Sequence, residues 1–481
     1  MNFASGYVRK NEYPEKILQI GEGNFLRAFA DYLVDVMNKK NLFSGSVVIC
    51  QPIQRGLCDK INAQNGLYTL LLRGIENGNV VEKSRVIESV SRCVNPYDDL
   101  NSFLDISRNP DLKVIISNTT EAGIVYSESD KCDDVLNATY PAKLTRFLYE
   151  RYVNFQGDSE KGLLILPVEL IEENGNTLRD CVTKYIKLWS LGEDFKKWVL
   201  ENSYFSNTLV DRIVTGFPED EAEKIFERLG YKDNLLDTAE PFFFWAIEIN
   251  DKWRNVFPAD KSGLEVVFCD NISSYKTRKV RILNGAHTVS VLGAFMSGFN
   301  TVLEMMNDSD FCEFISETLD KEVVPFINLP EKEKADFKNA VLERFKNPFI
   351  KHKLLDISLN SVSKYKARCL PSALDNIANG KFPKRLFFGL ACLIAFYKGE
   401  FEDGRFYGIR DGEKYEIRDD ITILDFICEA YKKEDFVELI LMNKDFWGTN
   451  LTEIDGVTDY VAKAVSLIDS CGVKKAMELL L

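Results

Sequence analysis

The amino-acid sequence predicts an α/β protein with two domains: a domain built on a mostly parallel β-sheet, followed by a mainly α-helical domain. Three observations support this prediction. The chain has 481 residues, 45% of them hydrophobic, which is more than one compact core usually holds. In the first half, short apolar runs typical of buried strands alternate with helical patterns. From Lys279 onward the strand signals disappear and helical patterns follow one another.

Four continuous apolar runs in the first half indicate strands that are covered on both faces, as in a parallel sheet. They are residues 16–20, 47–50, 113–117 and 162–166. Helical periodicity over residues 24–38 separates the first two runs. Residues 208–249 are charged and irregular, and residues 265–270 are expected to form a further strand.

The second half is expected to be helical. The helical patterns cover residues 280–299, 311–324, 332–345, 384–397, 422–432 and 457–470. The longest apolar run, residues 386–397, is too short to span a bilayer and predicts a buried helix. We therefore divide the chain into a first domain of residues 1–276 and a second of residues 277–481.

Composition and charge exclude several classes of partner. The formal net charge of −14 works against non-specific nucleic-acid binding, although a local cationic pocket can still hold an anion. The eleven cysteines form no CxxC pair and no zinc-type Cys/His spacing, so we expect reduced thiols, no metal and a cytoplasmic protein. The first residues lack the apolar core of a signal peptide, and no membrane partner is expected.

A glycine-containing turn follows the first predicted strand. The segment Gly21-Glu-Gly23-Asn24-Phe25-Leu-Arg27 comes directly after the strand and opens a helix. In that context two glycines let the backbone approach a pyrophosphate, and the helix N-terminus supplies amide donors. The third glycine of the full fingerprint is missing, and many turns use glycine only for its positive φ. The turn favours a Rossmann-type dinucleotide-binding domain, and leaves an ordinary turn as the alternative.

The cofactor type stays open on the residues alone. The second strand should bring an acid to the adenosine ribose, but the residue there is Gln51, and Arg55 nearby favours a 2′-phosphate. After the third strand, Thr119 and Glu121 lie where ligands bind in this architecture. Alternatively, Thr119 or Thr120 caps a following helix.

Lys279, Asn284 and His287 form the most informative pattern in the chain. In a regular helix Asn284 and His287 lie about 140° and 80° from Lys279, so all three can face one pocket. A lysine in a low-dielectric pocket can act as the base that takes an alcohol proton, and the amide and imidazole can donate to the oxygen that becomes an alkoxide. The structural alternative is a solvated lysine, a buried amide and a core histidine.

Three segments together resemble the mannitol dehydrogenase family of long-chain polyol and aldonate dehydrogenases. They are GEGNFLRAF at residues 21–29, the K-x4-N-x2-H pattern of Lys279, Asn284 and His287, and RFKNPFIKHKLLDISLNSVSKYKARCLP at residues 344–371. The resemblance implies an NAD-linked oxidoreductase that needs no metal, with Lys279 as general acid/base and Asn284 and His287 on the carbonyl. The alternative of a different class is a non-catalytic nucleotide-binding protein.

Within the family, the resemblance is closer to members that act on sugar acids. Polyol-acting members place an Asp-Asn pair where this chain has Glu169 and Leu170, so a polyol contact there is lost or moved. We expect Glu169 to contact the substrate. A carboxylate on the substrate must be paired, and the cationic residues available are His352, Lys364, Lys366 and Arg368. We expect Lys364, with His352 or Arg368, to bind it; a solvated basic face is the alternative.

Overall fold

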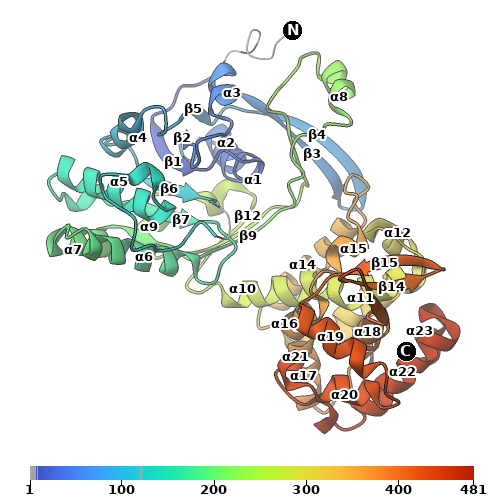
Figure 1. Ribbon diagram of the computed structural model, residues 1–481. Coiled ribbons are helices and arrows are strands. Elements are labelled where there is room, and N and C mark those ends of the chain that lie inside the picture. The colour runs from blue at the N-terminus through green and yellow to red at the C-terminus, as the bar shows by residue number, and fades with distance from the viewer. Residues whose placement is uncertain (1–6, 8, 120–121) are drawn as a thin grey trace. The chain divides into compact units, whose positions relative to one another are not determined.

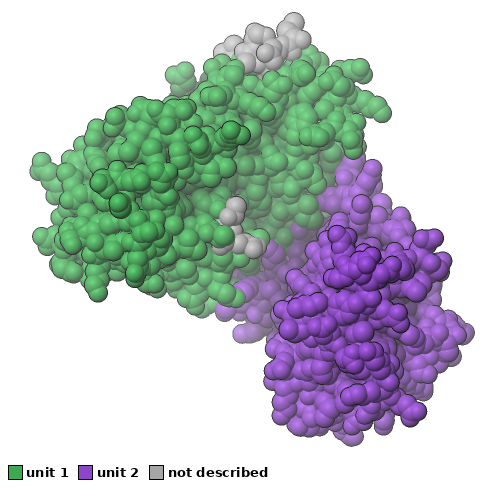
Figure 2. Space-filling model, viewed as in Figure 1, with its two compact units in different colours: residues 1–272 green, residues 273–481 purple. Residues whose placement is uncertain are grey.

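The computed structural model describes residues 7, 9–119 and 122–481. The chain divides into two compact units, residues 1–272 and 273–481, which Figure 2 shows in different colours. The division falls four residues before the boundary at 276/277 that we expected from the sequence. The first unit is built on a parallel sheet and the second is rich in helices, so the predicted fold class is confirmed (Figure 1).

The main sheet of the first unit has six parallel strands in the order β5-β2-β1-β6-β7-β8. The strands are β1 (Glu15–Ile20), β2 (Ser46–Cys50), β5 (Val90–Val94), β6 (Val114–Ser117), β7 (Leu164–Pro167) and β8 (Tyr204–Phe205). The chain leaves β1 toward β2 first and later returns to place β6 on its other side. This is the doubly wound order of a Rossmann fold, whose ligands bind where the strand order reverses. The four strands predicted from apolar runs are β1, β2, β6 and β7.

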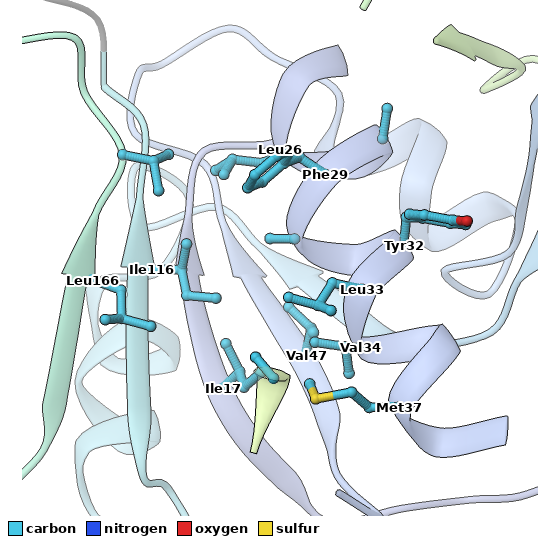
Figure 3. Packing of buried hydrophobic residues seen from close by; sticks show 14 of the residues in the cluster. Ile17, Leu26, Phe29, Tyr32, Leu33, Val34, Met37, Val47, Ile116 and Leu166 are labelled. Atoms are coloured by element: carbon cyan, nitrogen blue, oxygen red, sulfur yellow. The ribbon is translucent and has the colours of Figure 1, made fainter. Parts of the chain in front are cut away.

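Both faces of this sheet are buried because alternate side chains of each strand enter different hydrophobic cores. Ile17, Val47 and Ile116 belong to one core, and Leu18 and Ile115 belong to the other. Figure 3 shows the first core, where side chains of the helix after β1 point at the strands. The helices of the unit are α1 (Asn24–Leu26), the π-helix η2 (Arg27–Asp31), α2 (Tyr32–Lys39), α3 (Cys58–Ala63), α4 (Leu100–Ser107), α5 (Tyr140–Asn154), α6 (Asn174–Leu188), α7 (Glu193–Asn202), α8 (Ala222–Leu229) and α9 (Asp251–Arg254).

Two small sheets complete the first unit, and one of our expectations is wrong here. Residues 208–249, which we expected to be irregular, contain three strands. One sheet has the order β10-β3-β4 and the other β12-β11-β9. Their strands are β3 (Tyr68–Glu76), β4 (Asn79–Ile87), β9 (Thr208–Asp211), β10 (Asp237–Ala239), β11 (Phe244–Glu248) and β12 (Glu265–Cys269). Strands of three to five residues between charged segments are too short to give a periodic pattern.

The second unit is helical, as predicted, around helix α18, which is buried from Leu386 to Phe396. Its helices are α10 (Ser273–Arg278), the π-helix η6 (Lys279–Asn284), α11 (Gly285–Met296), α12 (Val302–Asn307), α13 (Ser309–Thr318), the π-helix η7 (Leu319–Val323), α14 (Glu331–Phe345), α15 (Leu354–Ile357), α16 (Ser361–Arg368), α17 (Leu370–Ala378), α18 (Lys384–Phe396), α19 (Ile421–Ala430), α20 (Phe436–Met442), α21 (Lys444–Trp447), α22 (Val457–Cys471) and α23 (Val473–Leu480).

The expectation that strands are absent after Lys279 is wrong. An antiparallel sheet of β13 (Gly399–Glu402), β14 (Arg405–Arg410) and β15 (Glu413–Ile417) lies in this unit. Its strands are charged and partly exposed, so they lack the apolar run of a buried strand. The Asp-Gly pairs at 403–404 and 411–412 are the missed signal, since all four residues have positive φ, as the tightest hairpin turns require.

Gly21 provides a test of local strain. Its φ is 122°, and a Cβ there would lie 3.1 Å from the carbonyl oxygen of Asn118. We expect Gly21→Ala to lower the free energy of unfolding by about 1–3 kcal/mol in urea denaturation. Gly23→Ala is the matched control, because Gly23 has a negative φ and a Cβ there would meet nothing within 4 Å. Equal stability of the two variants would contradict the assignment of strain to Gly21.

Candidate active site

The glycine turn lies at the carboxyl end of the central strand. The backbone N–H of Gly21 donates to the carbonyl of Cys50 at 3.0 Å, which joins the ends of β1 and β2. Gly23 is extended, with open space beside its Cα, and the helix begins at Asn24. The first backbone amides of that helix have no partners in the preceding turn, as at every helix start. The turn therefore has the backbone geometry and the space that a pyrophosphate requires.

Three predicted cofactor residues follow the glycines, and two of them support the turn rather than face solvent. Arg27 is 2% exposed, donates to the Asn24 side chain at 2.6 Å and lies 3.6 Å from the Asp237 carboxylate. Phe25 is partly buried and stacks on Phe29, with ring centroids 5.0 Å apart. The Arg27 guanidinium thus holds the N-terminus of the helix against β10.

A cavity of about 510 Å³ opens at the carboxyl ends of β1, β2 and β6. Its walls are mostly apolar, with polar groups from the strand ends. Among the residues that line it are Ile20, Gln51, Ile53, Tyr97, Asn118, Thr119, Tyr140 and Lys143. This is the point where the strand order reverses, and where a Rossmann sheet binds the adenosine half of a dinucleotide. The cavity, the open Gly23 and the helix start together fit such a cofactor.

Glu169 joins the ends of β6 and β7. It is 2% exposed, and its carboxylate accepts hydrogen bonds from the hydroxyl of Ser117 at 3.1 Å and from the amide and hydroxyl of Thr119 at 3.0 Å. Burial raises the pKa of this carboxyl. The alternative that Thr119 caps a helix is wrong, because no helix of the described residues begins there. The structure uses Glu169 to hold Thr119 in place. Glu121 and Thr120 lie outside the described residues.

Lys279 and Asn284 begin and end a π-helical segment, η6, inside the long helix of the second unit. A π-helix pairs residue i with residue i+5, which is the spacing of these two residues. The π-helical segment therefore places the Lys279 and Asn284 side chains closer to the same face of the helix than a regular α-helix would, in which they would lie about 140° apart. Both side chains are partly buried. Such single π-turns occur frequently at functional sites.

His287 lies one turn further on, near several cationic side chains. Its ring stacks on Phe345, with centroids 4.0 Å apart, and meets the ring of His352 edge-on at 5.3 Å. Its Nε2 atom is buried and has no hydrogen-bond partner among the described residues. Buried polar atoms are almost always paired, so an unpaired one marks a place where a ligand atom fits.

The predicted cationic residues converge on this ring. Burial lowers the pKa of His287 well below its usual value, and the charges of His352, Arg344, Arg368 and Lys364 lower it further. Burial likewise lowers the pKa values of His352, Lys364 and Arg368. The Lys364 ammonium donates to the carbonyl of Ile357 at 2.9 Å. Positive charge is thus concentrated around a neutral imidazole, and an anion bound there would relieve the repulsion.

Sequence reasoning missed three residues of this cluster. Arg344, at the end of α14, is 8% exposed and carries one of the charges that act on His287. Phe345 supports the imidazole ring, and the Thr288 hydroxyl accepts a hydrogen bond from Arg368 at 3.4 Å. Arg344 stands in the same family-like segment as His352, which was the available signal. Lys366, which we had grouped with these cations, is exposed and donates to the carbonyl of Asp445 instead.

Two other kinds of structural feature are absent from the described residues. No helix among them is both long and apolar enough to cross a membrane. No group of three or more His, Cys, Asp or Glu side chains in this part of the chain is arranged to hold a metal ion.

Two curated relatives match almost the whole chain. They are the altronate oxidoreductases of Escherichia coli O17:K52:H18 and Shigella flexneri. Each is 42% identical over an alignment of 476 residues that covers 97% of each chain.

Two solved structures have the same fold at about a fifth sequence identity. One is substrate-free D-sorbitol dehydrogenase, with a TM-score of 0.81, 22% identity, and coverage of 97% of this chain and 95% of that one. The other is mannitol 2-dehydrogenase of Pseudomonas fluorescens in a ternary complex with NAD and D-mannitol, with a TM-score of 0.65, 21% identity, and coverage of 98% and 94%.

Family models match both units. The mannitol dehydrogenase Rossmann domain matches residues 15–258, and the mannitol dehydrogenase C-terminal domain matches residues 271–469. The resemblance drawn from the glycine turn, the Lys-Asn-His pattern and the segment at residues 344–371 is therefore confirmed, and the chain belongs to the mannitol dehydrogenase family.

Proposed function

We propose that this protein is an NAD-dependent tagaturonate reductase, which interconverts D-tagaturonate and D-altronate. The observation that carries the proposal is the cationic cluster around the unpartnered imidazole of His287, which suits a sugar substrate with a carboxylate. The likeness to altronate oxidoreductases over 97% of the chain supports the same substrate. The nearest alternatives are a fructuronate reductase and a mannitol or arabinitol 2-dehydrogenase.

The first unit holds the cofactor. The backbone at Gly21 and Gly23 and the amides after Asn24 would bind the pyrophosphate, and the cavity beside Gln51 and Thr119 would take the adenosine half. NAD(H), when bound, supplies the hydride acceptor or donor. Glu169 contributes by positioning Thr119, and we no longer assign it to the substrate, because its carboxylate is already engaged with the ends of β6 and β7.

The second unit holds the sugar acid and moves the proton. In the reductive direction the Lys279 ammonium donates its proton to the carbonyl oxygen, and in the oxidative direction the amine takes it back. Asn284 and the neutral His287 donate hydrogen bonds to that oxygen as it gains charge. Lys364 and Arg368 bind the substrate carboxylate, with His352 completing the pocket. The two partly buried cations lose less to solvent screening than exposed ones would.

A panel of substrates tests the proposed reaction. D-Tagaturonate, D-fructuronate and D-fructose are offered separately with NADH, and oxidation of NADH is followed by absorbance. We expect turnover of tagaturonate to exceed that of the other two. D-Fructose lacks a carboxylate, so preferential turnover of D-fructose would refute the assignment of the cationic cluster and favour a polyol dehydrogenase.

Replacing Lys279 tests its role as acid and base. We expect Lys279→Ala to lower kcat by about 10²- to 10⁴-fold, because the proton transfer loses its partner. Circular dichroism and thermal unfolding of the variant check that it remains folded. If the protein were a non-catalytic nucleotide-binding protein, neither the wild type nor the Lys279→Ala variant would reduce tagaturonate. If the variant kept the wild-type rate, Lys279 would not be the general acid/base.

Replacing Lys364 tests the carboxylate site. Since hydrogen bonds to charged groups contribute about 1.5–3 kcal/mol, we expect Lys364→Met to raise KM for tagaturonate by roughly tenfold or more and to leave KM for NADH nearly unchanged. Lys366→Met is the matched control, because Lys366 lies on the same helix but is exposed and bonded to Asp445. The assignment is wrong if both KM values change alike, or if the control shows the same effect.

A further inference from the structure

The end of β2 lacks the acid that usually recognises the adenosine ribose in a Rossmann fold. The residue there, Gln51, is 2% exposed, and its amide is already used. Its Nε2 donates to the carbonyls of Ile53 and Gln54 at 2.9 and 3.2 Å, and its Oε1 accepts from the backbone of Cys58 at 3.1 Å. Gln51 therefore shapes the loop over residues 51–57, and both N–H donors of its amide are already used.

A carboxylate reaches the same loop from the neighbouring strand. Glu22, between the two glycines after β1, is only 8% exposed, and burial raises the pKa of its carboxyl while the backbone at Leu57 favours the charged form. A Cβ on Gly56 would lie 2.1 Å from Glu22 Oε1 and 2.6 Å from Gln51 Oε1. The Glu22 carboxylate thus packs directly against the backbone that follows β2, and the glycine at position 56 leaves it room.

This places an acid at the junction of the glycine turn and the end of β2, the region in which the fold binds the ribose of the cofactor. A carboxylate accepts a hydrogen bond from the 2′-hydroxyl of NAD(H) and repels the 2′-phosphate of NADP(H). Building on the proposed NAD-dependent function, we propose that Glu22 supplies the acid that β2 lacks and makes this enzyme select NAD(H) over NADP(H).

Arg55 opposes this selection. It is exposed in the same loop, where a guanidinium suits a phosphate. The sequence around β2, with an arginine and no acid, leaves the choice between NAD(H) and NADP(H) open, and the contact from Glu22 favours NAD(H). Removing the charge of Glu22 should therefore leave Arg55 as the dominant charge of the loop and improve the binding of NADPH.

The test measures binding of each cofactor to the full-length protein without any sugar substrate. NADH and NADPH are titrated separately, and calorimetry gives Kd for each. We expect the wild-type protein to bind NADH more tightly. We expect Glu22→Gln to reduce the ratio of Kd for NADPH to Kd for NADH by about tenfold or more. NADH loses the hydrogen bond from its 2′-hydroxyl to the carboxylate, and the 2′-phosphate of NADPH is no longer repelled.

Two further variants sharpen the test. Asp59→Asn is the matched control, because it removes one exposed negative charge at the start of the neighbouring helix α3 and should leave the ratio unchanged. Gly56→Ala keeps Glu22 but displaces its carboxylate, and should reduce the ratio as Glu22→Gln does. Gly56 has no positive φ, so alanine causes no backbone strain there.

The outcomes separate the two proposals. A folded Glu22→Gln protein that keeps the wild-type ratio, or binds both cofactors equally more weakly, overturns the role of Glu22, as does a wild-type protein that prefers NADPH. A wild-type protein that binds neither cofactor refutes the proposed function itself. Tagaturonate turnover with wild-type selectivity in Glu22→Gln refutes only the inference about Glu22.

Discussion

The parallel sheet of the first unit is buried on both faces, and this constraint decides where its chemistry can lie. Side chains along β1, β2 and β6 belong to two hydrophobic cores, so polar groups can meet a ligand only beyond the carboxyl ends of the strands. Glycines, amides and carboxylates gather at that edge. Most of them hold one another, as the hydrogen bonds from Thr119 to Glu169 show, and the free backbone at the glycine turn is left for the cofactor.

Both sequence motifs of the family run into π-helical segments. The helix after the glycine turn contains η2, and the helix of the Lys-Asn-His pattern contains η6 between α10 and α11. A π-turn costs stability relative to a regular helix, and proteins keep it where it places a side chain usefully. In η2 the buried guanidinium of Arg27 points back to Asn24. In η6 the five-residue spacing of Lys279 and Asn284 matches the π repeat.

The sequence predicted the parts of the fold that have a strong local pattern. The four buried strands and the long helices were found because apolar runs and helical periodicity are visible in one dimension. The strands β3 to β5, β8 to β11 and β13 to β15 were missed. Most of these are short or exposed and depend on partners far along the chain, whereas β3 is long and buried. At the site, residue types predicted the Lys-Asn-His pattern and the cations His352, Lys364 and Arg368. Only the fold shows that Arg27 supports the turn, because a sequence motif does not reveal whether a side chain is buried.

The stacked, unprotonated imidazole at the centre of the cationic cluster has a consequence for selectivity among anions. Because the His287 ring is neutral, negative charge is attracted by the surrounding Lys364, Arg368 and Arg344. The ring itself can form a hydrogen bond with a hydroxyl or carbonyl group. Small inorganic anions such as phosphate can pair with these cations as a carboxylate does. In the proposed function, selection of the sugar acid over such anions would therefore rest on the uncharged end of the substrate.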